Sequence, residues 1–226
     1  IDAYTTVNII DSDYDGVIDS LDYYPSDNTS SMICPEGHYG RHTCVKAEPG
    51  FYSPVRNLFS AFPCNPGEYQ NLYGSTECKM TPPGTYSESF AMNAPTKCPA
   101  GTYSQQLGKS DSKCIEASPG NWTKSGSSNQ IPCPLGTFQP SPGQSECLLS
   151  EYGFFVSKIG QNAQTECSPG TFQSLRGQSE CIPSNPGFFV SKNASIAEQP
   201  CLPGSFSNSS GNIDSLSCLI SEPGHF

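Results

Sequence analysis

A short glycine-centred motif recurs about every 17 residues, and this repeat limits what the chain can fold into. In each copy a glycine is followed two residues later by an aromatic residue. A unit this short cannot bury its own apolar side, so the copies must stack on one another to be stable. The twelve pairs are Gly37/Tyr39, Gly50/Tyr52, Gly67/Tyr69, Gly84/Tyr86, Gly101/Tyr103, Gly120/Trp122, Gly136/Phe138, Gly153/Phe155, Gly170/Phe172, Gly187/Phe189, Gly204/Phe206 and Gly224/Phe226.

The local sequence of a copy predicts a β-hairpin. Proline precedes the glycine in eight copies, as at Pro49/Gly50, which favours a type II turn with glycine at the position of positive φ. A short segment rich in aromatic residues, Ser and Thr follows and suits a strand of three or four residues, and a second glycine turn returns the chain. We therefore expect a small disulfide-rich, mainly β fold with little helix. It would be an elongated rod or solenoid of 17-residue hairpins, paired into 34-residue repeats.

The cysteines alternate strictly between two positions of the motif, three residues before the glycine in one copy and six before it in the next. Two disulfide registers fit this spacing. The second register would pair Cys44 with Cys64 and Cys78 with Cys98, and would leave Cys34 and Cys218 unpaired. We favour the first register because it uses all 12 cysteines. Its pairs are Cys34 with Cys44, Cys64 with Cys78, Cys98 with Cys114, Cys133 with Cys147, Cys167 with Cys181 and Cys201 with Cys218.

The composition indicates that disulfides, and not a large hydrophobic core, stabilise the fold. Leu, Ile, Val and Phe make up under a fifth of the chain, a fraction typical of disordered proteins, whereas each disulfide loop of this length stabilises by about 3 kcal/mol. An even set of cysteines predicts an oxidising compartment, so we expect an extracellular or cell-surface protein. Because the chain starts at Ile1 and carries no signal peptide, we expect a mature or partial chain.

Charge and hydropathy exclude two classes of partner. The formal net charge of −10 argues against a nucleic-acid partner. The chain contains no run of 18 apolar residues, so we expect no membrane span in it.

The pattern C-x-P-G-T-[FY]-x8-C, followed by a Pro-Gly-aromatic unit, resembles the ephrin-receptor-like cysteine-rich repeat, a relative of small EGF-like and tumour-necrosis-factor-receptor-like modules. The resemblance covers residues 34–226. It implies a long extracellular protein in which the repeats form a stalk without a catalytic role. The chain departs from denser members of that group in having two cysteines per 34 residues.

An acidic segment before the repeats, DSDYDGVIDSLD, predicts a calcium site. Its oxygen ligands fall at the positions that wrap a Ca²⁺ ion, and Gly16 permits the sharp turn. The segment is similar to the thrombospondin type 3 repeat, and the alternative is a solvated acidic turn without metal. Calcium would rigidify the join between residues 1–10, a β-prone segment, and the repeats at residues 32–226, across a loop and linker at residues 11–31. The expected ligands are Asp11, Asp13, Asp15, Val17, Asp19 and Asp22.

Two further motifs could bind a metal or carry a modification. Cys34, His38, His42 and Cys44 could bind zinc, but they also fit a shortened first repeat with an ordinary disulfide, which we favour. Four glycosylation sequons are present, and we expect some to carry glycans. They are Asn28, Asn121, Asn193 and Asn208.

The sequence therefore predicts a structural protein, a protomer of a filament, stalk or surface appendage. No nucleophile and base pair is evident, so we expect no enzymatic activity. The segment 1–10 and the half-unit at Gly224 could join copies head to tail into a homopolymer. We expect the twelve aromatic residues to form a ladder that packs repeat on repeat, with a sugar-binding platform as the alternative. The rival function is a ligand-binding receptor or adhesin ectodomain that recognises protein or glycan, with Trp122 as the first candidate contact.

Overall fold

The computed structural model describes residues 12, 26, 33–41 and 43–222, and in them the chain forms a series of β-hairpins. Eleven antiparallel two-stranded sheets follow one another, each with strands of two residues. The mainly β, disulfide-rich fold with hairpins at roughly 17-residue spacing is confirmed. The twelfth copy of the motif, at Gly224, lies outside the described residues.

Each sheet pairs two strands that are consecutive along the chain, β1 with β2, β3 with β4 and so on to β21 with β22. The helical part of the described chain is a short 3-10 turn, η1 (Ser215–Ser217), in the loop between β21 and β22. The strands are β1 His38–Tyr39, β2 Val45–Lys46, β3 Phe51–Tyr52, β4 Phe62–Pro63, β5 Glu68–Tyr69, β6 Lys79–Met80, β7 Thr85–Tyr86, β8 Thr96–Lys97, β9 Thr102–Tyr103, β10 Ile115–Glu116, β11 Asn121–Trp122, β12 Ile131–Pro132, β13 Thr137–Phe138, β14 Leu148–Leu149, β15 Phe154–Phe155, β16 Thr165–Glu166, β17 Thr171–Phe172, β18 Ile182–Pro183, β19 Phe188–Phe189, β20 Gln199–Pro200, β21 Ser205–Phe206 and β22 Leu219–Ile220.

The turn that opens each hairpin has the predicted geometry. At the start of β3, Gly50 has a φ of 90°, and the N–H of Phe51 donates to the carbonyl of Glu48 at 2.9 Å. Proline at the second position of the turn and a positive φ at the third are the signature of a type II turn. Glycine is required there because an L side chain would be strained.

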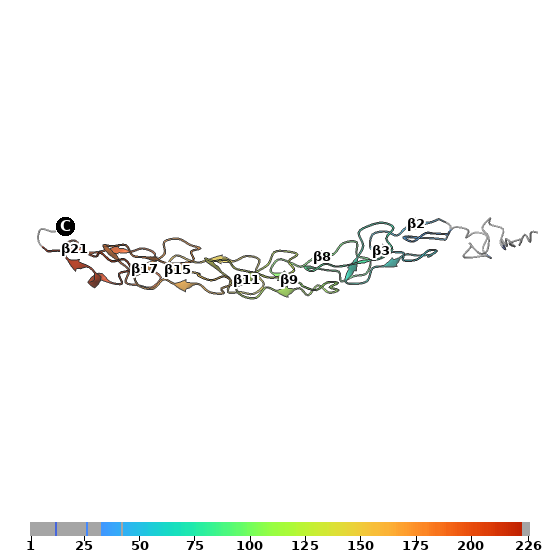
Figure 1. Ribbon diagram of the computed structural model, residues 1–226. Coiled ribbons are helices and arrows are strands. Elements are labelled where there is room, and N and C mark those ends of the chain that lie inside the picture. Colours follow the sequence, from blue (N-terminus) through green and yellow to red (C-terminus); the bar gives the residue numbers. More distant parts are fainter. Residues whose placement is uncertain (1–11, 13–25, 27–32, 42, 223–226) are drawn as a thin grey trace, which may run out of the picture. The chain divides into compact units, whose positions relative to one another are not determined.

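The chain divides into two compact units. One contains β1–β8 within Ile1–Lys97 together with Gln105–Lys113, and the other contains β9–β22 within Cys98–Ser104 and Cys114–Phe226. In the second unit the hairpins follow one another in chain order (Figure 1). In the described part of the chain, no helix has the length and apolarity to cross a membrane.

Within each unit, backbone hydrogen bonds join a hairpin to the next one along the chain. In the second unit, the Gly120 N–H donates to the carbonyl of Gln139 at 2.7 Å. The Gln139 N–H in turn donates to the carbonyl of Gln161, in the loop of the following hairpin, at 3.1 Å. That same loop donates the Gly160 N–H back to the Cys133 carbonyl at 2.8 Å. The stack is therefore held by main-chain groups that every repeat can supply.

Two columns of buried side chains run through the hairpins and take the place of a core. The first column is the residue three before the glycine, and the second is the residue three after it. Both are small or polar in most hairpins, which explains how a chain so poor in large apolar residues can order itself. The first column holds Cys34, Ala47, Cys64, Thr81, Cys98, Ala117, Cys133, Ser150, Cys167 and Ser184, and the second holds Ser53, Gln70, Ser87, Ser104, Thr123, Gln139, Val156, Gln173, Val190 and Ser207.

Candidate functional site

Six disulfides form in the first of the two predicted registers, so every second hairpin is closed covalently. The half-cystine in the first buried column bonds to a cysteine directly before the second strand of the same hairpin. The register that leaves Cys34 and Cys218 unpaired is wrong. The disulfides are Cys34–Cys44, Cys64–Cys78, Cys98–Cys114, Cys133–Cys147, Cys167–Cys181 and Cys201–Cys218. Such a set is typical of proteins that fold in an oxidising, secretory or extracellular setting.

The hairpins without a disulfide fill the same column with a small residue. Ala or a hydroxyl residue stands there, and the hydroxyls bond across the stack. Ser150 Oγ donates to the carbonyl of Gln178 at 3.3 Å, and Ser184 Oγ lies 3.4 Å from the carbonyl of Asn212. Because these hydroxyls are buried, the bonds also remove the cost of leaving them without a partner.

A backbone carbonyl from two hairpins further along the chain covers the turn glycine of most repeats. A Cβ added at Gly136 would come within 2.0 Å of the Gly177 carbonyl oxygen, and one at Gly153 would come within 2.1 Å of the Ala194 carbonyl oxygen. No real Cβ tolerates such an approach, so glycine is needed for close packing as well as for its positive φ. The same contact recurs at Gly37, Gly50, Gly67, Gly101, Gly120 and Gly170.

The residue that supplies this carbonyl sits in a left-handed conformation at the tip of the hairpin loop. In most hairpins it is the second glycine that the sequence indicated, such as Gly143 with a φ of 69°. Asn57, Ala91 and Ala194 take the same place with φ of 59°, 57° and 51°. Sequence reasoning missed these three because it searched for glycine, whereas their spacing from the neighbouring repeats would have revealed them.

The aromatic ladder expected along the stack is not what joins the repeats. In the hairpins that the structure describes, the aromatic residue of the motif is half-buried or exposed, and no two of these rings contact each other. One motif ring does pack on another ring, Tyr52 on Phe62 with centroids 5.8 Å apart, but the two lie within a single hairpin. The residues three before and three after the glycine are buried instead, and these positions connect the repeats.

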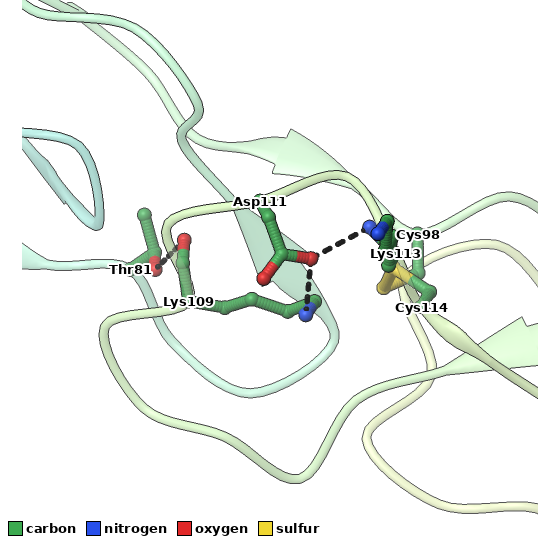
Figure 2. Close-up of polar contacts among 6 residues, drawn as sticks. All are labelled: Thr81, Cys98, Lys109, Asp111, Lys113 and Cys114. Atoms are coloured by element: carbon green, nitrogen blue, oxygen red, sulfur yellow. Dashed lines mark hydrogen bonds and ion pairs between the residues drawn. A yellow bond between two sulfur atoms is a disulfide. The ribbon is translucent and has the colours of Figure 1, made fainter.

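A buried lysine in the first unit is neutralised by a carboxylate in the same loop (Figure 2). The Lys109 side chain is 8% exposed, and its Nζ lies 2.8 Å from Asp111 Oδ1. The backbone N–H of Lys113 donates to the same oxygen at 2.8 Å. The hydrogen bond from Lys109, followed by the one from Lys113, lowers the pKa of Asp111 below its ordinary value. This loop belongs to the hairpin closed by Cys98–Cys114, whose two cysteines are 16 residues apart, compared with 14 in three of the other disulfide-bonded hairpins.

The predicted calcium ligands and one sequon fall outside the described residues. Asp11, Asp13, Asp15, Val17, Asp19, Asp22 and Asn28 all lie there, so the calcium hypothesis stays a prediction.

The structure argues against a zinc site at the first repeat, because the two cysteine thiolates that would bind zinc are not available. Cys34 and Cys44 are joined in a disulfide, and His38 Nδ1 lies 3.2 Å from the carbonyl oxygen of Glu36. Elsewhere in the residues that the structure describes, no cluster of three or more His, Cys, Asp or Glu side chains could hold a metal.

The three described sequons differ in how well they could carry a glycan. Asn193 and Asn208 are exposed on loops. Asn121 instead donates its amide to Ser118 Oγ at 3.2 Å and to the Pro119 carbonyl at 3.3 Å. Its sequon threonine, Thr123, is fully buried and donates to the Thr102 carbonyl at 3.1 Å. A glycan at Asn121 would disturb its amide contacts, whereas Asn193 and Asn208 leave room for one.

Among the described residues, cavities are found at the first hairpins and at the β21–β22 hairpin. One, of about 240 Å³, lies in the first unit and is lined by Tyr39, Glu48, Phe51, Ser60 and Ala61. The other, of about 480 Å³, lies at the β21–β22 hairpin and is lined by apolar residues, including Leu202 and Leu216, and by Ser205 and Ser215.

No model of a known protein family matches the chain, and no curated protein matches it closely enough to indicate kinship. The repeats are therefore established here by the chain's own regularity, as six regularly spaced disulfide-bonded hairpins alternating with disulfide-free ones.

Proposed function

We propose that the chain is an extracellular structural repeat protein, a protomer of a filament, stalk or surface appendage that resists unravelling. The main support for this proposal is the uniformity of the stack within each unit. Hairpin after hairpin makes the same main-chain hydrogen bonds to its neighbours. A protein that passes force or spans distance needs such uniformity, because its weakest repeat sets its strength. The proposal includes no enzymatic step.

Disulfides would supply the resistance to extension. Each one closes a hairpin between the first buried column and the second strand, so force applied along the chain passes through the S–S bond and cannot unfold the loop inside it. The hairpins between them carry no such bond and would yield first. The disulfide-bonded hairpins would therefore limit the total extension.

Calcium would act at the acidic segment before the repeats. Five carboxylates in twelve residues repel one another without a cation, and a bound Ca²⁺ would stiffen the join to the repeats. Calorimetry with Ca²⁺ should release or absorb heat, and that signal should disappear when Asp13 and Asp15 are changed to Asn. A titration without heat would end the calcium part of the proposal.

Single-molecule stretching of the oxidised chain tests the mechanical function. We expect the oxidised chain to show a series of unfolding steps and to stop short of its full contour length. Reduction should release the extra length held in the six loops. An oxidised chain that lengthens smoothly at low force, like a disordered polymer, would contradict the proposal.

A receptor or adhesin ectodomain is the second candidate, supported by the cavity at Tyr39, Phe51 and Glu48. A cavity lined by aromatic residues and an acidic residue suits a sugar or a small cationic group. The test is binding to an array of sugars. Binding by the wild-type chain that is abolished in Tyr39→Ala would favour this candidate over a purely structural role.

A further inference from the structure

Hairpins of the second unit pack on the hairpin two further along the chain, so those with a disulfide stack on one another and those without one do the same. Gly136 and the Gly177 carbonyl that covers it both belong to disulfide-bonded hairpins, whereas Gly153 and the Ala194 carbonyl belong to disulfide-free ones. Equivalent places in either set therefore follow one another at the spacing of one two-hairpin repeat. A place that carries the same exposed residue type in successive repeats forms a column along the unit.

Lysine occupies one such place in the disulfide-free hairpins of the second unit. Each of these lysines stands two residues before the left-handed residue of its loop, which is Gly160 in the β15–β16 hairpin. All three are exposed, and in the described part of the chain none of them forms an ion pair. The same place in disulfide-bonded hairpins of this unit holds Ser141 or Leu175, so the loop folds without lysine. We define the basic column as Lys124, Lys158 and Lys192.

Glutamate and an aliphatic residue occupy a second column, on disulfide-bonded hairpins. Glu146 and Glu180 each stand directly before the second cysteine of a hairpin, and Leu148 and Ile182 stand directly after it. Leu148 is 46% exposed and Ile182 is 40% exposed. Both glutamates are exposed, and neither takes part in an ion pair among the residues that the structure describes. We define the acidic column as Glu146, Leu148, Glu180 and Ile182.

The two columns complement each other in charge and in spacing. Both follow the same stack, so successive members of each column are one repeat apart, and a second copy can align its lysines with the glutamates of the first. A single exposed ion pair contributes little to stability. Several pairs at a matched spacing, beside apolar side chains that become buried, provide both attraction and a defined register.

We infer that the basic column of one copy of this chain binds the acidic column of a second copy, so that protomers associate side by side. The inference rests on the proposed structural function, because lateral pairing would bundle the protomers of a filament or stalk. It uses residues of the second unit alone, and both columns lie on hairpins inside the stack.

Charge reversal followed by mixing tests the pairing. The full oxidised chain is produced without N-glycans, because Asn193 stands beside Lys192, and its association is measured by sedimentation velocity at low salt, where exposed charges are least screened. We expect the wild-type chain to associate. Lys158→Glu/Lys192→Glu and Glu146→Lys/Glu180→Lys should each weaken association at least tenfold when measured alone. An equimolar mixture of the two variants should associate again, because opposite charges then face each other.

The matched control is Glu116→Lys/Glu166→Lys, which changes the net charge as much as the reversal of the acidic column does. It places lysine where Lys46 and Lys97 stand in hairpins of the first unit, and it should leave association unchanged. A monomeric wild-type chain, equal weakening by the control, or a mixture that does not regain association would overturn the inference. A monomeric chain that still extends in steps under force would remove the inference and leave the structural function in place.

Discussion

Hairpins with and without a disulfide occupy equivalent places in the stack, and the difference between them separates two sources of stability. The β13–β14 hairpin is closed by Cys133–Cys147, whereas the β15–β16 hairpin that follows has Ser150 in the buried column. Both make the same main-chain bonds to their neighbours. The stack therefore specifies the fold of a hairpin, and the disulfide limits how far the hairpin can open.

The largest effect should come from reducing all six disulfides at once. Each loop contributes about 3 kcal/mol, and the buried columns offer few large apolar groups to compensate. We expect the reduced chain to lose its structure at 25 °C, measured as loss of amide protection and of near-ultraviolet circular dichroism. A reduced chain that keeps its amide protection would show that the stack alone is sufficient.

Removing one disulfide converts one class of hairpin into the other. The double variant Cys167→Ser/Cys181→Ser places a serine where Ser150 and Ser184 stand in disulfide-free hairpins. We expect it to lose about 3 kcal/mol of unfolding free energy and to keep its hydrogen bonds to neighbouring hairpins, as judged by denaturant titration and amide exchange. Loss of protection throughout the second unit would mean that the disulfide specifies the fold as well.

The covering carbonyl can be tested with a matched pair of glycine variants. Gly136→Ala and Gly187→Ala both force alanine into a positive φ, of 77° and 82° respectively, but only Gly136 lies under a carbonyl. Gly136→Ala should cost about 1–3 kcal/mol more than Gly187→Ala because of overpacking. Equal losses in thermal unfolding would assign the whole cost to backbone strain.

The smallest expected effect concerns the longer loop at Lys109. Asp111 has a lowered pKa, so its contribution to stability is present above its ordinary pKa of 3.8 and is lost as the pH falls through the lower folded value. Asp111→Asn should therefore melt below the wild type at pH 7, and the two melting temperatures should converge at about pH 2. A difference in melting temperature that is independent of pH would show that the carboxylate charge has no role.

The sequence was most informative where one residue type was required at a fixed place. Glycine with a positive φ and cysteine at two alternating positions predicted the hairpins, their spacing and the disulfide register. The sequence did not reveal the second buried column, three residues after the glycine, where residues as different as Ser53, Gln139 and Val190 are buried. Side chains at that position are selected for their fit against the next hairpin and not for one residue type. Sequence reasoning also failed for the aromatic residues, whose regular spacing reflects their place in the first strand and not contact between rings.

Native-state hydrogen exchange of individual amides tests the central claim most directly. The claim is that disulfide-free hairpins are ordered by the stack. The Gly153 N–H donates to the Gln173 carbonyl at 2.9 Å, and the Gly136 N–H donates to the Val156 carbonyl at 2.9 Å, although only the Gly136 hairpin has a disulfide. We predict that the two amides are protected to a similar degree in the oxidised chain. Fast exchange at Gly153 beside a protected Gly136 would show that the disulfide-free hairpins are linkers between disulfide-bonded modules, and would contradict this account.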